Sequence, residues 1–341
     1  MKVLFRVDAS SAMGIGHLMR CQALAQALAQ QQVEIIFALR QQTVPLARGR
    51  HDWVGQVKSI PDHVSQPEEL DWLQQQFDLD EFDFVVLDGY QFDHKYRASL
   101  KAAFNYLVIF DDNNDSGPLY ADMVINAASN ADKLNYSRTA PEAIYCLGTD
   151  YRILRQEFYS QPPVDWQQRH SLTLMLGGSD PLNLTLPILQ SLQKRKVDIP
   201  LRVITGAAYP YLDELQAFIQ QSAQPIQHIH NCQQMAEVVS YSRMMLSAAG
   251  GSQFEIAYCH TPALLVIVAE NQRNATRQAA QQGWCEVFDA TEKVDIELLT
   301  DKLLTVWHDD SQLHNMHLQA ELMSPANGAE NVLDSLERMW R

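Results

Sequence analysis

A short apolar strand runs into a helix through the stretch Arg6-Val-Asp8-Ala-Ser-Ser-Ala-Met-Gly14-Ile-Gly16-His17-Leu-Met-Arg20. The strand is predicted over Val3–Val7 and the helix over Leu18–Gln30. Two glycines therefore lie where the strand turns into the helix, and a histidine stands in the first helical turn. In α/β proteins ligands bind at this end of a parallel sheet, and glycine lets the backbone approach them closely. We expect this loop to be part of a functional site.

The position of His17 makes it a candidate base. A helix N-terminus carries partial positive charge, which disfavours protonation of a nearby imidazole, so the ring can accept a proton. An ordinary polar residue at the start of a helix explains this loop equally well. Two glycines fall short of the dinucleotide fingerprint, and strand Val33–Leu39 ends in Arg40 rather than in an acidic residue for a ribose. Both observations argue against a nicotinamide cofactor.

Composition narrows the class of protein. A chain of 341 residues exceeds what one hydrophobic core usually supports, so two domains are expected. The net charge of −15 disfavours nucleic acid as a partner, although local backbone amides can still bind a small anion. The five cysteines are far apart, which predicts reduced, mostly buried thiols and no zinc site. Since no signal peptide or membrane span is recognised, we expect a cytoplasmic monomer with no membrane partner.

Strand-like and helix-like segments alternate along both halves of the chain. Short apolar strands separated by helices predict parallel sheets covered on both faces. The expected fold is α/β, with two Rossmann-like, doubly wound domains that face each other across a ligand-binding cleft. Beyond the first strand and helix, the first half has predicted strands at Val33–Leu39, Phe84–Leu87, Tyr106–Phe110, Met123–Ile125 and Ala143–Leu147 and a helix at Glu68–Phe77. The second half has predicted strands at Ser171–Leu176, Leu201–Thr205, Arg243–Ser247 and Ala263–Val268 and helices at Leu184–Leu192, Leu212–Gln221, Gln253–Cys259 and Ala329–Trp340.

A proline-containing segment separates the two halves. The residues Gln161-Pro-Pro-Val-Asp-Trp-Gln-Gln-Arg169 break the alternation and suit an interdomain linker. We place the N-terminal domain at residues 1–158, the linker at 159–169, the C-terminal domain at 170–325 and a final helix at 326–341.

A glycine-rich loop in the second half opens a helix directly after a strand. It reads Ala248-Ala-Gly250-Gly251-Ser252-Gln-Phe-Glu255 and offers backbone amides to a phosphate. Ser252 and Glu255 also have the spacing of a capping box, which would satisfy the helix's own amides. Glu255 has a second possible role, as an acceptor for ribose hydroxyls. We favour a phosphate site here.

Two more motifs follow strands of the second half. Gly177-Gly178-Ser179-Asp180 is either a second phosphate loop or a turn in which Asp180 starts a helix. The dipeptide Asn271-Gln272 offers uncharged amides that suit sugar hydroxyl and N-acetyl groups, although an ordinary turn uses such residues too. Its place after the neighbouring strand puts it near Gly251.

Carboxylates follow two strands of the first half, at Asp88-Gly89-Tyr90 and at Asp111-Asp112. Adjacent residues in extended chain point apart, so the second pair makes a poor metal site, and we expect one member to orient a neighbour. Tyr90 is a candidate for lining a sugar pocket. Four histidines are predicted to be solvated or exposed rather than metal ligands: His228, His230, His314 and His317.

These residues together resemble the PseG family, the UDP-sugar hydrolases of the pseudaminic acid pathway. The resemblance spans nearly the whole chain, whereas the C-terminal motifs by themselves are also similar to GT-B glycosyltransferases such as MurG. The matching stretches are Arg6-x-Asp8, Gly14-x-Gly16-His17-x-x-Arg20, Val86-Leu-Asp88-Gly-Tyr90, Phe110-Asp-Asp112, Leu147-Gly-Thr-Asp-Tyr151-Arg-Ile-Leu-Arg155-Gln-Glu-Phe158, Gly177-Gly-Ser-Asp180, Gly250-Gly-Ser252-x-x-Glu255 and Asn271-Gln272.

The resemblance implies a GT-B fold with the nucleotide held mainly by the C-terminal domain. It also implies inverting hydrolysis of UDP-2,4-diacetamido-2,4,6-trideoxy-β-L-altropyranose to UDP and free sugar, with neither metal nor cofactor. His17 would activate the water, and we expect Asp8 to orient its ring. The residues implied to bind substrate are Arg6, Asp8, Gly14, Gly16, Arg20, Asp88, Tyr90, Arg155, Asn271 and Gln272. Those implied to bind UDP are Gly178, Ser179, Gly250, Gly251, Ser252 and Glu255.

Two other functions stay open at the level of sequence. A GT-B glycosyltransferase would share the C-terminal motifs and transfer the sugar to an organic acceptor. A non-catalytic nucleotide-sugar-binding protein would share them without turnover. The acetamido groups and the L-configuration of the sugar rest on the resemblance alone.

Overall fold

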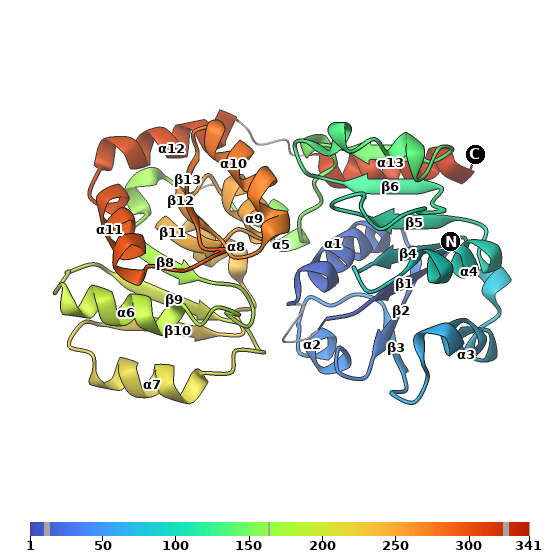
Figure 1. Ribbon diagram of the computed structural model, residues 1–341, viewed down its shortest axis with the longest axis horizontal. Helices are drawn as coiled ribbons and strands as arrows, with labels where there is room; N and C mark the ends of the chain where they lie inside the picture. The colour runs from blue at the N-terminus through green and yellow to red at the C-terminus, as the bar shows by residue number, and fades with distance from the viewer. Residues whose placement is uncertain (10–13, 163, 323–326, 341) are drawn as a thin grey trace. The chain divides into compact units, whose positions relative to one another are not determined.

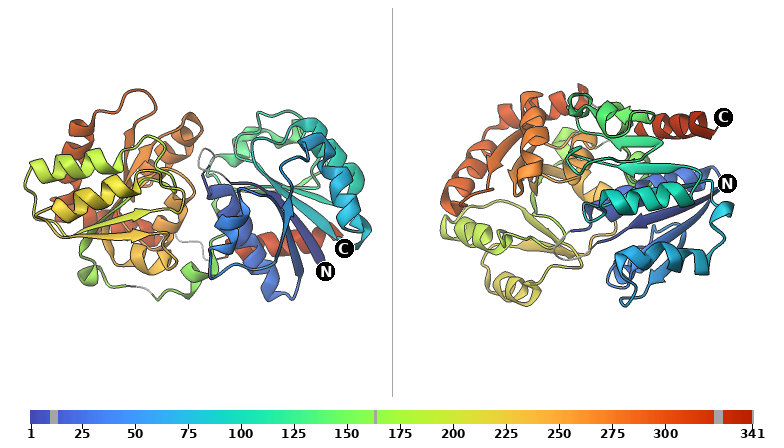
Figure 2. Two further views of the ribbon diagram at one scale, coloured as in Figure 1. Left: turned by 90° about the horizontal axis from the view of Figure 1, so that it is seen from below. Right: turned by 45° about the vertical axis from the view of Figure 1, so that its right-hand side comes forward.

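The computed structural model describes residues 1–9, 14–162, 164–322 and 327–340, and the chain divides into two compact units (Figure 1). Unit 1 extends to Gln156 and also contains the C-terminal helix, whereas unit 2 comprises Gly14 and the residues from Glu157 onward. Both termini of the chain therefore belong to unit 1 (Figure 2).

Unit 1 is built on a parallel sheet with helices on both faces. Among the described residues the sheet has seven strands, in the order β3-β2-β1-β4-β5-β6-β7. The strands are β1 (Lys2–Val7), β2 (Glu34–Arg40), β3 (Gln56–Ile60), β4 (Phe84–Asp88), β5 (Leu107–Phe110), β6 (Met123–Asn126) and β7 (Ile144–Leu147). The helices are α1 (Gly16–Gln30), α2 (Val44–Arg48), α3 (Glu69–Gln76), α4 (His94–Ala103) and α13 (Gly328–Trp340).

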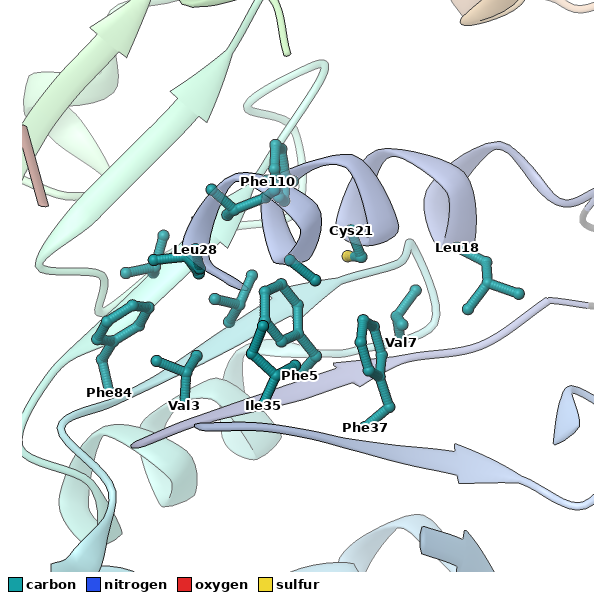
Figure 3. Close-up of a cluster of buried hydrophobic side chains, with 14 of the residues drawn as sticks. Val3, Phe5, Val7, Leu18, Cys21, Leu28, Ile35, Phe37, Phe84 and Phe110 are labelled. Atoms are coloured by element: carbon teal, nitrogen blue, oxygen red, sulfur yellow. The ribbon is translucent and has the colours of Figure 1, made fainter. Parts of the chain in front are cut away.

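The side chains of β1 alternate between two hydrophobic layers. Phe5 and Val7 are buried in the layer shared with α1, α2 and α13, and Figure 3 shows this layer between α1 and the sheet. Leu4 is buried in the opposite layer, which α3 and α4 cover. Because both faces of the sheet are covered, its central strands are buried and mostly apolar, the pattern that predicts a parallel sheet.

Unit 2 repeats this architecture. Among the described residues its parallel sheet has six strands, in the order β10-β9-β8-β11-β12-β13. The strands are β8 (Ser171–Met175), β9 (Leu201–Thr205), β10 (Ile226–His230), β11 (Ser242–Ala248), β12 (Ala263–Ile267) and β13 (Cys285–Asp289). The helices are α5 (Gln156–Ser160), α6 (Thr185–Lys194), α7 (Leu212–Gln221), α8 (Met235–Ser240), α9 (Ser252–Tyr258), α10 (Arg273–Gln281), α11 (Ile296–Trp307) and α12 (Asp310–Leu322).

Strand order reverses once in each sheet, next to the first strand of the unit. In unit 1 the chain places β2 and β4 on opposite sides of β1, and in unit 2 it places β9 and β11 on opposite sides of β8. At such a switch point the connections leave in opposite directions, and doubly wound sheets bind ligands at the adjoining strand ends. The predicted loops after β1, β4, β8 and β11 all lie at these two positions.

The predicted α/β fold with two doubly wound sheets is confirmed, and each predicted strand and helix is present with small shifts of its ends. The sequence reading missed β3, β10 and β13, which lie at sheet edges or carry exposed polar residues, and it missed several amphipathic helices. Four of the cysteines are buried, as predicted: Cys21, Cys146, Cys259 and Cys285.

His317 is buried, which contradicts the prediction that it is exposed. Helix α12 places its ring against Trp166, with 5.2 Å between the ring centroids, and its Nδ1 lies 2.7 Å from the carbonyl oxygen of His260. The mixed polar sequence of α12 concealed this buried face. His314 on the same helix is exposed, as predicted. In β10, His230 is exposed and His228 is partly buried, with its Nε2 2.9 Å from the Thr205 hydroxyl.

Candidate functional site

His17 and Asp88 meet at the switch point of unit 1. Helix α1 begins at Gly16, so His17 lies in its first turn, and Asp88 is the last residue of the neighbouring strand β4. The imidazole Nδ1 is 2.8 Å from Oδ1 of Asp88, whose side chain is fully buried. Nη2 of Arg20 also lies 3.1 Å from Nδ1 and can only donate, but the carboxylate is nearer and can only accept, so we assign the Nδ1 hydrogen to the Asp88 contact. The lone pair of Nε2 is then available to take a proton.

Arg20 stands one turn after His17 on α1 and holds Asp88 from the same side. Its Nε and Nη2 donate to the two oxygens of Asp88, at 2.5 and 2.6 Å, and its Nη1 donates to Asp112 at 2.6 Å. Burial by itself would raise the pKa of Asp88, but Arg20 and His17 hold it below its ordinary value. Asp88 is therefore a carboxylate at neutral pH, able to stabilise a positive charge on His17.

Tyr90 completes the cluster at its exposed side. Its hydroxyl donates to Oδ2 of Asp112 at 2.6 Å, and its ring meets the His17 ring edge-on, with 4.7 Å between centroids. Burial acts to raise the pKa of Asp112, yet Arg20 and the Tyr90 hydroxyl lower it to about 2. Tyr90 is 58% exposed, so its ring is accessible beside the imidazole.

The sequence reading named four of the five residues of this cluster as site residues and left out Asp112. The signal for Asp112 was its position just beyond β5, and the expectation that one of the two adjacent aspartates orients a neighbour is confirmed. Asp111 has different partners, since it accepts hydrogen bonds from Tyr136 and from the amide of Asn114.

Asp8 does not orient His17, which corrects the expectation from sequence. Its Oδ1 accepts from the backbone amide of Arg40 at 2.9 Å, and its Oδ2 pairs with Arg6 at 2.6 Å. Arg6 is 1% exposed and is also paired with the buried carboxylate of Glu69 at 2.7 Å. Both residues thus belong to a buried ion network beneath the sheet end, and their contact with substrate stays a prediction.

The remaining predicted residues of the first half of the chain differ in accessibility. Gly14 has a positive φ of 76°, and a Cβ at Gly14 or Gly16 would meet no atom of the described residues within 4 Å. Arg155 is 5% exposed. Burial acts to raise the pKa of Asp52, but Arg50 and, to a smaller extent, Arg155 lower it. The contact of Arg155 with substrate stays a prediction.

In unit 2, the loop after β8 combines a helix cap with a close backbone contact. Asp180 accepts from the amides of Leu184 and Thr185, at 2.9 and 2.8 Å, so it binds the start of α6, which begins at Thr185 and not at Asp180 as the turn interpretation predicted. A Cβ on Gly206 would lie 2.4 Å from the carbonyl oxygen of Gly178, so the loops after β8 and β9 touch through their backbones. Ser179 is 8% exposed.

The loop after β11 is open. A Cβ on Gly250 or Gly251 would meet nothing within 4 Å. Helix α9 begins at Ser252 with Gly251 as its N-cap, so the predicted capping box of Ser252 and Glu255 is wrong. The amides at the start of this helix receive no capping side chain from Gly251, because glycine has none. Glu255 is partly exposed in the first turn.

The turn after β12 holds Gln272, whose Oε1 accepts from the amide of Val268 at 3.0 Å. Asn271 lies in the same turn, and its side chain is outside the described residues. No group of three or more histidine, cysteine, aspartate or glutamate side chains within the described ranges is arranged to hold a metal ion. No helix in the described part of the chain is long and apolar enough to cross a membrane.

Comparison with known sequences finds one matching family model and several similar proteins. Residues 173–332 match the glycosyltransferase family 28 C-terminal domain. The chain is 24% identical over 287 residues to the UDP-2,4-diacetamido-2,4,6-trideoxy-beta-L-altropyranose hydrolase of Campylobacter jejuni, covering 83% of this chain and 98% of that protein. It is 26% identical over 283 residues to the uncharacterized protein MJ1062 of Methanocaldococcus jannaschii, covering 80% of this chain and 57% of that protein. The chain thus spans little more than half the length of this second relative.

Comparison with solved structures shows the fold. MurG of Acinetobacter baumannii matches with a TM-score of 0.64 and 17% identity, over 99% of both chains. A UDP complex of MnaA from S. aureus matches with a TM-score of 0.64 and 13% identity, over 98% of this chain and 96% of that one. The predicted GT-B architecture is therefore confirmed.

Proposed function

We propose that this protein is a nucleotide-sugar hydrolase in which His17 activates water. The contact of His17 Nδ1 with Asp88 carries this proposal, since it leaves Nε2 as a proton acceptor beside an accessible tyrosine ring. The match of residues 173–332 to a glycosyltransferase domain supports a nucleotide-sugar substrate. The likeness to the Campylobacter hydrolase, which extends over nearly all of that protein, supports hydrolysis.

The proposed step breaks the bond between the anomeric carbon and the diphosphate oxygen. Water attacks that carbon from the opposite side, which inverts its configuration, and its proton passes to Nε2 of His17. Asp88 stabilises the resulting imidazolium, and Arg20 fixes the orientation of Asp88. A positioned general base of this kind contributes about 10²- to 10⁴-fold to the rate.

Unit 2 is proposed to bind the uridine diphosphate. The open backbone at Gly250 and Gly251, and the first amides of α9, suit an anionic group. The loop at Gly178 and Ser179 would support the same diphosphate. We propose UDP-2,4-diacetamido-2,4,6-trideoxy-β-L-altropyranose as the substrate, with UDP and the free sugar as products, because this is the compound named for the Campylobacter relative.

Turnover without an acceptor tests the proposal. Purified protein is incubated with the UDP-sugar in buffer alone, and UDP and the anomer of the sugar first released are measured. Stoichiometric UDP and inverted free sugar are expected. UDP release only after an organic acceptor is added would instead indicate a glycosyltransferase, the activity that the family 28 match favours as second candidate.

A histidine substitution separates catalysis from binding. His17→Gln should lower kcat by about 10²- to 10⁴-fold while the affinity for UDP stays the same. His63→Gln, at an exposed histidine of unit 1, is the matched control and should behave as the wild type. Unchanged turnover in His17→Gln would exclude His17 as the base.

A further inference from the structure

A cavity of about 70 Å³ lies within unit 1 at the carboxyl ends of β4 and β5. Its wall includes Asp88, Gly89 and Tyr90, so it adjoins the cluster around His17. The volume is sufficient for a few water molecules, or for a substituent of a few heavy atoms. The mechanism above makes no use of this space.

Arg97 of α4 lines the cavity and has hydrogen-bonding capacity to spare. It is 4% exposed, and its Nη1 and Nη2 donate to the hydroxyl and carbonyl oxygens of Ser116, at 2.8 and 2.6 Å. Its Nε has no hydrogen-bond partner, and among the described residues no carboxylate forms an ion pair with it. A guanidinium has five N–H donors, so three remain for other acceptors. A buried arginine with so few partners favours an acceptor group in the adjoining space.

Other residues of the wall restrict what that group can be. The carboxylates of Asp88, Asp111 and Asp115 outnumber the single guanidinium, which disfavours an anion. Asp111 is already engaged with Tyr136 and Asn114, whereas Asp115 is exposed and has no hydrogen bond or ion pair within the described ranges. Asp115 can therefore accept from a donor in the cavity.

Part of the wall is apolar, and Asn113 and Ser116 add polar groups to the rest. The buried side chains of Phe92 and Ile109 line the apolar part, at 2% and 4% exposed. A ligand that suits all of these surfaces has an acceptor oxygen, an N–H or O–H donor and a small apolar end. A secondary amide with a methyl group combines the three features in four heavy atoms.

We propose that this cavity binds an acetamido substituent of the sugar. Its carbonyl oxygen accepts from Arg97, its N–H donates to Asp115, and its methyl group contacts Phe92 and Ile109. This inference depends on the proposed function only for the statement that the ligand is a sugar held beside His17. It assigns substituent recognition to residues separate from the base.

Three substrates test the assignment by turnover. One is the diacetamido UDP-sugar, and the other two are analogues, each with a different one of the two acetamido groups replaced by hydroxyl. In the wild type, kcat/KM should fall for one of the two analogues, and Arg97→Lys should reduce that preference by roughly 10- to 100-fold. Asp115→Ala, at an exposed position that should fold normally, should reduce it by roughly 3- to 10-fold. Asp62→Ala, at another exposed aspartate of unit 1, is the control and should leave the preference unchanged. Equal losses on all substrates in both cavity variants would overturn the proposal.

A binding measurement separates this proposal from the hydrolase activity. The Nε–Hε resonance of Arg97, assigned by its absence from Arg97→Lys, is followed while the free diacetamido sugar is added. We expect the resonance to shift when the diacetamido sugar is added. It should stay in place with a free sugar in which hydroxyls replace both acetamido groups. A shift without any UDP hydrolysis would support the cavity assignment and contradict the proposed function. Turnover of the UDP-sugar with an unmoved resonance at saturating sugar would overturn the assignment and leave the hydrolase intact.

Discussion

His17 and Asp88 are 71 residues apart in the chain, and a 2.8 Å contact joins them at the reversal of strand order in unit 1. The contact fixes which imidazole nitrogen carries the hydrogen. It also couples the first turn of α1 to the end of β4, so the ring has one orientation. The predictions below follow from this pair and from the groups around it.

Asp88→Asn should reverse the hydrogen bond to His17. The side-chain amide of asparagine can donate to Nδ1, which moves the ring hydrogen to Nε2 and removes the proton acceptor. We expect kcat to fall by about 10³- to 10⁴-fold, measured by UDP release. Asp112→Asn changes a residue that contacts Arg20 and Tyr90, and it should lower kcat by less than tenfold. Equal losses of kcat in the two variants would contradict the assigned tautomer.

Stability should decrease at acid pH through the carboxylates of this cluster. The folded pKa of Asp112 is lowered to about 2, and that of Asp88 is lowered as well. A carboxyl with a depressed folded pKa stabilises the fold fully above its unfolded pKa of about 4, and this contribution is lost as the pH falls through the folded value. The free energy of unfolding in urea should decrease between about pH 5 and pH 2. In Asp112→Asn this decrease should be smaller. A slope unchanged in the variant would argue against the pairing.

Tyr90→Phe should weaken the site without destroying it. The ring stays beside His17, and the 2.6 Å hydrogen bond to Asp112 is lost. A single hydrogen bond to a charged group corresponds to roughly a 10- to 100-fold loss in kcat/KM. Tyr90→Ala removes the ring too and should lose more, and an activity of Tyr90→Ala equal to that of Tyr90→Phe would show that the ring has no role.

Glu69→Gln should destabilise the protein strongly. Glu69 is fully buried and pairs with Arg6, so its neutralisation leaves a buried guanidinium short of a counter-charge, a loss of about 3–5 kcal/mol. The free energy of unfolding in urea measures it. Glu297→Gln breaks an exposed pair with Arg195 and should change stability by less than about 1 kcal/mol. Similar values for both variants would contradict the buried network.

Gly206→Ala and Gly251→Ala should act on different properties. The first places a Cβ 2.4 Å from the Gly178 carbonyl oxygen and should lower the melting temperature. The second meets open space at a φ of −55°, so the protein should fold as the wild type. If the diphosphate approaches Gly251, UDP affinity measured by calorimetry should fall in this variant, and an unchanged Kd would exclude that approach.

The sequence located the strand ends better than it located the contacts across them. Apolar strands followed by Gly-x-Gly-His and by Asp-Gly-Tyr predicted correctly that His17, Asp88 and Tyr90 stand at the carboxyl ends of neighbouring strands. The sequence did not distinguish Asp8 from Asp88 as the partner of His17, since both lie at strand ends. The choice depends on Arg40 and Arg6, which hold Asp8, and on Arg20, which holds Asp88.

Sequence patterns did not predict the cavity beside this cluster. Arg97 occupies an unpredicted helix, and nothing in its neighbours marks it as buried. Its position depends on how α4 lies against β4 and β5, which is a property of tertiary packing. The capping box at Ser252 failed for a related reason, because its spacing is right but the helix begins one residue too early for it.

The last helix, α13, supplies Val332 and Leu336 to the same hydrophobic layer as Phe5. Gly328 at its start is so close to Arg152 that a Cβ would lie 1.9 Å from its carbonyl oxygen. During synthesis, unit 1 is therefore incomplete until α13 has left the ribosome, although β1 is made before unit 2. Unit 2 has its whole chain by then and can fold earlier. A stop codon a few residues upstream of α13 would consequently damage the half of the protein that was translated first.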